Sequence, residues 1–450
     1  MGIRVATAIA REQRTFGRRG LGMSASREPQ GMLDRRFSTT WRSSAEELRT
    51  VLTALARKHR VPGAQLAVRS GGETLVVQTG VEREGRPRRM RASSKVPVGS
   101  ITKAFTATVA MMLVADDDLE LDAPISEVLP KVPGADALTL RRLLSHTAGL
   151  PCDPAEETAS RLRNQDLAEP VCPPGTAFSY SNLGYALVGR VIEAVVGMPW
   201  REAVDAILLR PLGIDPVFVG DALSVSGHTA AGQPVGQLLA PILEPVGGLA
   251  LSAADLAAFG RVHLGKPGLL DVVTASEMHT PVPVAEPVGL ADGWGLGLAI
   301  FGGDGVDWLG HDGTADGTSC HLRIDQAGAC VIALTANSVN GTALWRELID
   351  ELRLRGVPIT RYRACPEQAS RIDLPARYHG TYRNGAAEYT VTSDERGVPC
   401  LVADGEVFRD LTLYEGGAFT LAEPGTGEPA DAGRFMRDAV LAGGRLARRA

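Results

Sequence analysis

Hydrophobic residues recur along the chain at helical and at strand-like spacings, in an order that predicts its organisation. Apolar positions between Leu48 and Leu55 repeat at helical spacing after the capping box Ser44-x-x-Glu47, which predicts an N-terminal helix. Residues 64–68 and 74–78 are apolar runs on either side of a glycine-containing turn and predict a hairpin. Further helices are predicted at residues 104–115, 138–144, 183–196 and 343–354, and strands at 293–299, 308–314, 319–324 and 330–335.

The order of these elements predicts the α+β fold class. A helix and two strands come first, a mostly helical segment follows, and three strands and a helix close the unit. This order implies an antiparallel sheet flanked by helices, with a helical half inserted between its strands, over residues 44–356. Residues 357–376 are predicted to be a linker, and residues 377–450 a small, barrel-like all-β domain with strands at 389–391, 400–402, 411–414 and 435–440.

The composition excludes several classes of protein. The chain has 450 residues, 22% of them charged, and a net charge of −5, so nothing indicates a nucleic-acid-binding surface. It has no run of 18 apolar residues that would predict a membrane helix. Residues 1–43 hold nine arginines and three acidic residues without an apolar export segment, which predicts a disordered basic tail and a cytoplasmic protein. The six cysteines are scattered without C-x-x-C spacing, which disfavours a zinc site or a disulfide framework.

Ser100 and Lys103 open the apolar segment 104–115, one helical turn apart, so their side chains share one face of the predicted helix. A serine and an amine that meet at the edge of a core suit a nucleophile and its base. The chain has only five lysines among 47 basic residues, and a desolvated lysine, unlike an arginine, can lose its proton. An alternative stays open, in which Ser100 caps the helix and Lys103 is an ordinary first-turn residue.

Two further residues have a structural as well as a functional interpretation, and a third has a structural one. Tyr180 and Asn182 lie two residues apart where a loop enters the helix 183–196, so both can point into one site. Alternatively, Asn182 caps that helix and Tyr180 packs against it. His146 follows the helix 138–144 and is predicted to be a structural histidine at its C-terminus.

Three short segments carry a resemblance to a known family. In chain order they are Ser100-Ile101-Thr102-Lys103, Tyr180-Ser181-Asn182 and His311-Asp312-Gly313. Together they resemble the serine β-lactamase and penicillin-binding-protein family, and most of all its class C-like branch of esterases, D-aminopeptidases, DD-peptidases and acyltransferases. The resemblance covers about residues 45–355 and implies a β-lactamase/transpeptidase-like fold, while residues 377–450 resemble the lipocalin-like barrels appended to some members.

The resemblance also implies a mechanism that needs no cofactor and no metal. Ser100 attacks a carbonyl and forms an acyl-enzyme, Lys103 takes the serine proton, and Tyr180 passes a proton to the leaving group. The backbone N–H groups of Ser100 and Thr314 form the oxyanion hole. The implied catalytic residues are Ser100, Lys103, Tyr180 and His311, and the implied substrate-binding residues are Asn182, Asp312, Gly313 and Thr314.

One residue departs from the family pattern. His311 stands where many members have a lysine that binds the substrate carboxylate, and a largely neutral histidine suits proton transfer better than anion binding. We therefore expect a serine acyl hydrolase or acyltransferase of bacterial biosynthetic metabolism that acts on an intracellular ester, thioester or amide. The expected partners are a small-molecule or peptidyl acyl donor, free or carrier-protein-bound, and an amine, alcohol or water acceptor, with no nucleic acid and no membrane.

Two other functions stay open at this point. One is a D-amino-acid peptidase or β-lactamase, and the other is a ligand-binding homologue without catalysis. The role of the last domain is also open, because Arg445 either reaches the site or only covers the end of the barrel.

Overall fold

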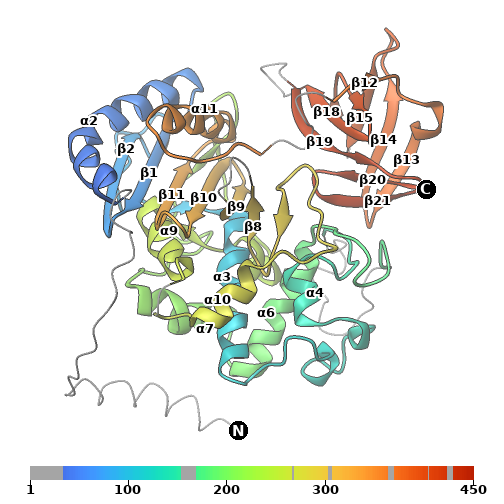
Figure 1. Ribbon diagram of the computed structural model, residues 1–450, viewed down its shortest axis with the longest axis horizontal. Coiled ribbons are helices and arrows are strands. Elements are labelled where there is room, and N and C mark those ends of the chain that lie inside the picture. Colours follow the sequence, from blue (N-terminus) through green and yellow to red (C-terminus); the bar gives the residue numbers. More distant parts are fainter. Residues whose placement is uncertain are drawn as a thin grey trace.

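The chain forms a helix-flanked sheet with a helical half, and a second, curled sheet at its C-terminal end (Figure 1). The computed structural model describes residues 34–153, 169–265, 268–302, 307–362, 369–403, 405–422 and 429–450. This mixture of antiparallel sheets and helices confirms the predicted α+β class.

The first sheet has seven antiparallel strands in the order β2-β1-β11-β10-β9-β8-β7. Because β1 pairs with both β2 and β11, the beginning and the end of this unit are neighbours within the sheet, and the helical half is inserted between β2 and β7. The predicted hairpin and the predicted strands after residue 308 are confirmed. The strands are β1 (Gly63–Ser70), β2 (Glu73–Gly80), β7 (Gly293–Trp294), β8 (Ala299–Phe301), β9 (Trp308–Ala315), β10 (Thr318–Asp325) and β11 (Cys330–Ala336).

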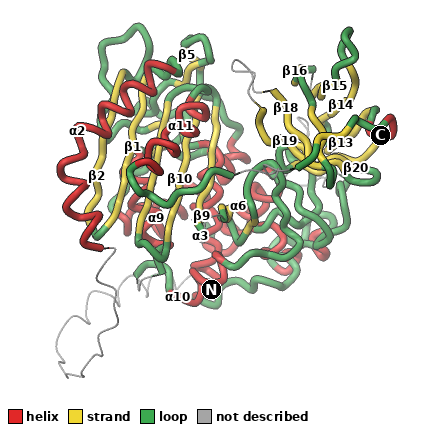
Figure 2. The backbone as a smooth tube through the Cα atoms, turned by 45° about the horizontal axis from the view of Figure 1, so that its top comes forward, coloured by secondary structure: helices red, strands yellow, loops and turns green. Residues whose placement is uncertain are grey.

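Helices cover both faces of this sheet (Figure 2). Helices α2 (Asp34–Lys58) and α11 (Gly341–Leu354) pack on one face, and α9 (Ala253–Gly260) packs on the other. Successive side chains of a strand point to opposite faces, so β11 serves both cores. Ile332 belongs to the cluster beneath α2 and α11, and its neighbour Val331 belongs to the cluster of the helical half.

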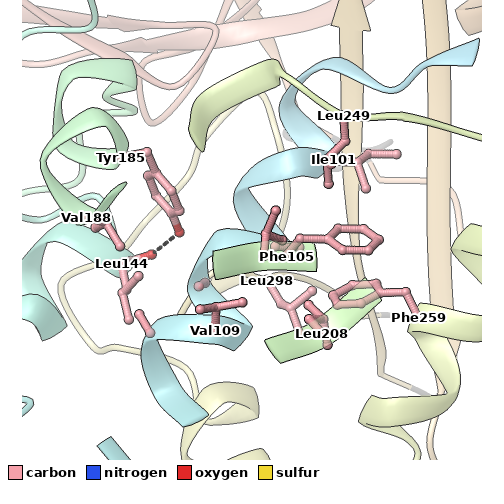
Figure 3. Close-up of a cluster of buried hydrophobic side chains, with 14 of the residues drawn as sticks. Ile101, Phe105, Val109, Leu144, Tyr185, Val188, Leu208, Leu249, Phe259 and Leu298 are labelled. Atoms are coloured by element: carbon pink, nitrogen blue, oxygen red, sulfur yellow. Dashed lines mark hydrogen bonds between the residues drawn. The ribbon is translucent and has the colours of Figure 1, made fainter. Parts of the chain in front are cut away.

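Helix α3 (Thr102–Ala115) crosses the middle of the helical half and is buried almost all round. Its side chains Phe105 and Val109 contact neighbours from several elements, and Phe105 stacks on Phe259 of α9 (Figure 3). The other helices of this half are α4 (Leu140–Leu144), α6 (Asn182–Val196), α7 (Trp200–Val204), α8 (Glu244–Gly247) and α10 (Val272–His279). Two short strand pairs complete the unit, β3 (Val96–Pro97) with β6 (Ala250–Leu251) and β4 (Gly227–His228) with β5 (Pro234–Val235).

Replacing Phe105 by alanine should destabilise the chain by about 3–5 kcal/mol, because it leaves a cavity in the packed core. The Phe105 side chain is fully buried, and its ring centroid lies 3.8 Å from that of Phe259. The measurement is urea denaturation followed by far-ultraviolet circular dichroism. As a control, Val273→Ala at a 77% exposed position should change the free energy of unfolding by less than about 0.5 kcal/mol. Equal losses in both variants would contradict the prediction.

The C-terminal unit is a curled half-barrel of ten antiparallel strands in the order β12-β17-β18-β19-β20-β21-β13-β14-β15-β16. Its inner face holds a separate apolar core that includes Tyr382, Phe419 and Phe435. The strands are β12 (Arg371–Ile372), β13 (Gly380–Asn384), β14 (Ala387–Ser393), β15 (Pro399–Ala403), β16 (Glu406–Phe408), β17 (Thr412–Tyr414), β18 (Ala418–Ala422), β19 (Pro429–Phe435), β20 (Ala439–Ala442) and β21 (Arg445–Arg449).

Four predicted boundaries are wrong. The predicted strand 293–299 is two short strands, β7 and β8, with residues 295–298 between them. Helix α2 starts at Asp34, so residues 34–43 belong to it and not to a disordered tail. A Ser-x-x-Glu pattern also fits a helix interior, because serine costs well below about 1 kcal/mol there. The predicted strand 435–440 is the β19–β20 hairpin, whose turn is closed by the bond from the Met436 N–H to the Ala439 carbonyl. Strand β12 lies within the predicted linker, and the predicted tail residues 1–33 lie outside the described residues.

In the described part of the chain, no helix is both long enough and apolar enough to span a bilayer.

Candidate active site

Ser100 and Lys103 meet at the start of α3. Ser100 lies in the 3₁₀ turn η1 (Gly99–Ile101), which leads directly into α3, and Lys103 follows one turn later. The Lys103 Nζ donates a hydrogen bond to the Ser100 Oγ at 2.9 Å. No side chain caps the first residues of η1 or α3, so Ser100 is not a helix cap. The predicted proximity of the two side chains is confirmed.

Lys103 is surrounded by aromatic rings and backbone. Its side chain is fully buried, its Nζ also donates to the Val246 carbonyl at 3.3 Å, and it lies 5.0 Å from the ring centroid of Tyr180. None of the ion pairs among the described residues includes Lys103. Burial, assisted by the positive charge of Arg445, lowers the pKa of Lys103 to about 7. At neutral pH a large fraction of this amine is therefore unprotonated and able to accept a proton.

Tyr180 precedes α6 and lies beside the serine and the lysine. Burial raises the pKa of Tyr180 well above its usual value, and a hydrogen bond with Ser100 offsets this only in part. The tyrosine is therefore a protonated hydroxyl at neutral pH, which is able to donate a proton. The cap of α6 is Ser181, whose Oγ accepts the Gly184 N–H at 2.9 Å.

Asn182 is the first residue of α6, so it does not cap that helix. Its Nδ2 donates to the Asp153 carboxylate at 2.5 Å, and its Oδ1 is buried without a hydrogen-bond partner among the described residues. An amide oxygen without a partner suits an N–H group of a substrate, and the resemblance implied that Asn182 binds the substrate.

Strand β9 lies against the turn that holds Ser100. A Cβ on Gly313 would overlap the Val98 carbonyl oxygen and would lie 3.0 Å from the Ser100 nitrogen. A Cβ on Gly99, which has φ +51°, would overlap the backbone of Thr314. Two glycines thus allow the backbones of Ser100 and Thr314 to approach each other, as an oxyanion hole made of their N–H groups requires.

His311 lies on the same face of β9 as Gly313 and belongs to the group of rings around Tyr180. Its ring centroid lies 5.3 Å from that of Trp294 and 6.5 Å from that of Tyr180. Burial and the nearby Lys103 lower the pKa of His311 to about 4, so the imidazole is neutral at neutral pH. Its Nδ1–H donates to the Asp312 carbonyl at 2.6 Å, which leaves Nε2 as an acceptor without a partner among the described residues.

The prediction that Asp312 contacts the substrate is wrong. Neighbouring residues of a strand point to opposite faces, so Asp312 points away from the face that carries His311. Its carboxylate receives hydrogen bonds from Arg323 at 2.6 and 3.0 Å and from His321 at 2.8 Å. The same His321 has its Nε2 3.0 Å from the Oγ of Ser319. This Asp–His–Ser chain resembles a catalytic triad, but Ser319 is fully buried, so no substrate reaches it.

The C-terminal unit takes part in the candidate site. The Tyr180 N–H donates to the Gly444 carbonyl at 2.8 Å, and the Arg445 Nε donates to the Cys152 Sγ at 2.9 Å. The Arg445 guanidinium lies 5.9 Å from the ring centroid of Tyr180. Asn384 accepts the Cys152 N–H at 2.7 Å and donates to the Leu446 carbonyl at 2.8 Å. Arg445 therefore reaches the site and does more than cover the end of the barrel.

Sequence reasoning missed two ring residues of this site. Trp294 was assigned only to a strand, and His146 only to a helix end, but both rings lie within 6 Å of Tyr180. What distinguishes His146 is its positive φ, and this angle is a property of the folded backbone that the sequence does not show. Among the described residues, no group of three or more His, Cys, Asp or Glu side chains could hold a metal ion.

Comparisons with known proteins show the family of this chain. A family model described as Beta-lactamase matches residues 48–356. Penicillin-binding protein 4 of Amycolatopsis lactamdurans is 33% identical over 368 residues, which cover 74% of this chain and 96% of that protein. The crystal structure of SurE is 36% identical with a TM-score of 0.78, and the match covers 91% of this chain and 100% of that chain.

A second structure of SurE, with D-Leu, is also 36% identical and has a TM-score of 0.77 over 91% of this chain and 100% of that chain. A D-stereospecific amidohydrolase from Streptomyces sp. is 27% identical with a TM-score of 0.55, over 67% of this chain and 97% of that chain. The family model covers most of the chain, and the match to SurE, which covers 91% of it, extends into the C-terminal unit. The chain belongs to the beta-lactamase family, which unites serine β-lactamases, penicillin-binding proteins and related serine hydrolases.

Proposed function

We propose that the protein is a serine acyl hydrolase or acyltransferase that forms an acyl-enzyme on Ser100. One observation carries the proposal: a fully buried lysine, with a pKa lowered to about 7, contacts the Ser100 Oγ at 2.9 Å. A base whose pKa lies near the working pH combines a useful unprotonated fraction with basic strength.

Acylation then needs only side chains and backbone of this chain. As the Ser100 oxygen forms its bond to the carbonyl carbon, its proton moves to Lys103, and the negative charge on the carbonyl oxygen is stabilised by the N–H groups of Ser100 and Thr314. When the tetrahedral intermediate collapses, the bond to the leaving group breaks. Tyr180 gives its proton to the departing alcohol, thiol or amine and regains one from Lys103.

Deacylation reverses these roles with water, an amine or an alcohol as the attacking group. As the nucleophile bonds to the acyl carbon, Tyr180 takes its proton and gives its own to Lys103, which returns a proton to the Ser100 oxygen as the bond to the acyl carbon breaks. His311 is neutral, and its unpartnered Nε2 is suited to accept a hydrogen bond from the incoming nucleophile. A neutral ring gives less help to a substrate carboxylate than a lysine would, which disfavours β-lactam turnover and favours an ester, thioester or amide donor.

The positive charge of Arg445 favours a substrate that carries a carboxylate. Among the described residues, no Asp or Glu side chain forms an ion pair with Arg445, whose Nε contacts only the Cys152 sulfur. A guanidinium binds a carboxylate through two parallel hydrogen bonds. Two of the matched structures have names that refer to the D-configuration: SurE with D-Leu and a D-stereospecific amidohydrolase. They support a peptidyl substrate that contains a D-residue. A donor attached to a carrier protein in bacterial biosynthesis is part of this proposal.

The function is tested by trapping the acyl-enzyme. The protein is mixed with p-nitrophenyl esters and with peptidyl thioesters of a short pantetheine-like thiol, and intact mass and peptide mapping follow the adduct. We expect one acyl group on the peptide that contains Ser100. Product ratios with added amines or alcohols then separate transfer from hydrolysis. No adduct with any donor, or an adduct elsewhere in the chain, would overturn the proposal.

A D-amino-acid peptidase or β-lactamase is the second candidate, because penicillin-binding proteins and β-lactamases are members of the same family. Nitrocefin and a D-Ala-D-Ala peptide are therefore included in the substrate set. Turnover of either substrate above that of the esters and thioesters would favour this candidate over the leading proposal.

Replacing Arg445 by methionine should lower kcat/KM about 10- to 100-fold for substrates with a free carboxylate, because a charge-assisted hydrogen bond contributes about 1.5–3 kcal/mol. Matched substrates with a carboxamide in its place should be turned over about equally by both proteins. Arg448→Met is the control, since Arg448 lies on the same strand and is exposed. A loss that is equal for carboxylate and carboxamide substrates would contradict the carboxylate contact.

A further inference from the structure

His146 packs directly against the ring of Tyr180. The two ring centroids are 4.3 Å apart with an interplanar angle of 30°, which is a stacked arrangement. The His146 side chain is 1% exposed, and the rings of Phe178, Tyr185 and Trp294 surround it on its other sides. One face of the Tyr180 ring is therefore held by a side chain that cannot move without disturbing this cluster.

His146 also fixes the backbone on both sides of Tyr180. The Ser179 N–H donates to the His146 carbonyl at 2.8 Å, and the Ser181 N–H donates to the His146 Nδ1 at 3.0 Å. Because Nδ1 accepts a hydrogen bond, it carries no proton, so the ring is neutral with its proton on Nε2. The residue before the tyrosine and the residue after it are thus bonded to the same histidine.

The backbone of His146 is held in a costly conformation. Its φ of +57° lies in the left-handed region, which costs about 1–3 kcal/mol for residues other than glycine and is better tolerated by asparagine. Such strain persists only where surrounding contacts determine it, and here these contacts are those that hold Tyr180. The strained backbone lets the carbonyl and the ring of His146 both contact the loop that contains Tyr180.

We propose that His146 is a positioning residue that sets the distance between the Tyr180 hydroxyl and Ser100. This inference rests on the proposed function, because it gives Tyr180 a proton-transfer role. It replaces the interpretation of His146 as a histidine of helix C-terminal structure alone. His146 touches no reacting atom, so it acts only through the tyrosine.

The surroundings keep His146 neutral, as the hydrogen bond from Ser181 requires. The groups that face it are Lys103, His311 and Arg445, together with the hydroxyls of Tyr180 and Tyr185. Burial, followed by the charge of Lys103, holds the pKa of His146 well below its usual value. Over the working pH range the contact with Ser181 is therefore constant.

Three substitutions separate the contacts of His146. His146→Asn tolerates the left-handed backbone and offers an amide oxygen in place of Nδ1, so it keeps the bond from Ser181 but loses the stacked ring. His146→Phe keeps a ring but loses the acceptor. His146→Gly loses both and relieves the backbone strain. His263→Asn is the matched control, since His263 is also fully buried but is bonded to Thr108 and His279, away from Tyr180.

We expect His146→Gly to lower kcat about 10²-fold with a smaller change in KM, because a shift of about 1 Å in a catalytic group has this effect. His146→Asn should recover about 10-fold of that loss, since it satisfies the buried Ser181 N–H, which otherwise costs about 1–3 kcal/mol. His263→Asn should lower the melting temperature without lowering kcat of the folded protein. If all three His146 variants fold and keep the kcat of the parent protein, the inference is wrong.

A second measurement does not depend on activity. The ionisation of Tyr180 is followed from tyrosinate absorbance, as the difference between each protein and the same protein with Tyr180→Phe. The parent protein should show no Tyr180 ionisation at the usual pH of tyrosine, because burial raises the pKa of Tyr180. His146→Gly should bring the ionisation back toward that usual pH, and His146→Phe should not. An unchanged titration in His146→Gly overturns the positioning role, whereas a parent protein that forms no acyl-enzyme overturns only the proposed function.

Discussion

Replacing Ser100 by alanine is expected to lower kcat by about 10⁴-fold or more and to abolish the acyl-enzyme adduct. The Ser100 oxygen is the hydroxyl that Lys103 contacts, so we expect no neighbouring group among the described residues to replace it. Ser100 is only partly buried, so we expect the variant to fold. The measurements are intact mass after an activated ester and steady-state kinetics, with thermal unfolding to show that the variant is folded.

Ser319→Ala is the matched control for this result. Ser319 lies on β10, in the Asp–His–Ser chain, so it has the hydrogen bonds of a triad serine but no exposure to solvent. Its loss should leave the adduct on Ser100 and the kcat of the folded protein essentially unchanged. An adduct that persists in Ser100→Ala and disappears in Ser319→Ala would reverse the assignment of the nucleophile.

The parts of the site that the sequence predicts are those set by local geometry. Ser100 and Lys103 are one turn apart, and any helical turn brings such a pair together. The strands around residues 308–335 follow one another with short turns, so their pairing also follows from the order along the chain. The curled C-terminal sheet is predicted in outline, but the prediction of one strand over 435–440 overlooks Arg437 and Asp438, which interrupt the apolar residues at the hairpin turn.

The wrong prediction that Asp312 contacts the substrate is one that the sequence alone can correct. Alternation along a strand puts His311 and Gly313 on one face and Asp312 on the other. The three residues match the family as one motif, but their side chains do not all lie on the same face of the strand. The partners of Asp312, which are Arg323 and His321, lie on the adjacent strand and face the same way, so the carboxylate supports the sheet opposite the site.

Arg445 and His146 are beyond prediction from local patterns for a different reason. Arg445 is separated from Cys152 by 293 positions, and only the docking of the C-terminal unit brings them together. His146 lies near Tyr180 because its backbone adopts a left-handed conformation, which histidine seldom prefers. Both residues depend on tertiary packing that overrides local preference. The same packing joins the two units, since Tyr180 is bonded to His146 through its neighbours and to Gly444 through its own N–H.

Replacing Lys103 by methionine should lower kcat/KM about 10³-fold, because the site then lacks the general base. Lys103→Arg should be equally impaired, since a guanidinium stays protonated at any working pH. In the parent protein, kcat/KM should fall as the pH drops below about 7, where Lys103 becomes protonated. In Arg445→Met, the fall of kcat/KM should begin at a higher pH, because the charge of Arg445 lowers the pKa of Lys103. The measurement is kcat/KM against pH for an ester whose own hydrolysis is subtracted.

The pH dependence of the free energy of unfolding is an independent measure of the pKa of Lys103. The pKa of Lys103 is about 7 in the folded chain and 10.5 in an unfolded one. Between these values the unfolded chain holds a proton that the folded chain has released, so this lysine makes stability rise with pH over that window. Lys103→Met lacks the titration, so the free energy of unfolding of the parent protein should increase relative to that of Lys103→Met as the pH rises from 7 to 10.5. A difference that is constant over this range would mean that Lys103 keeps its proton when folded, and the serine would then need another base.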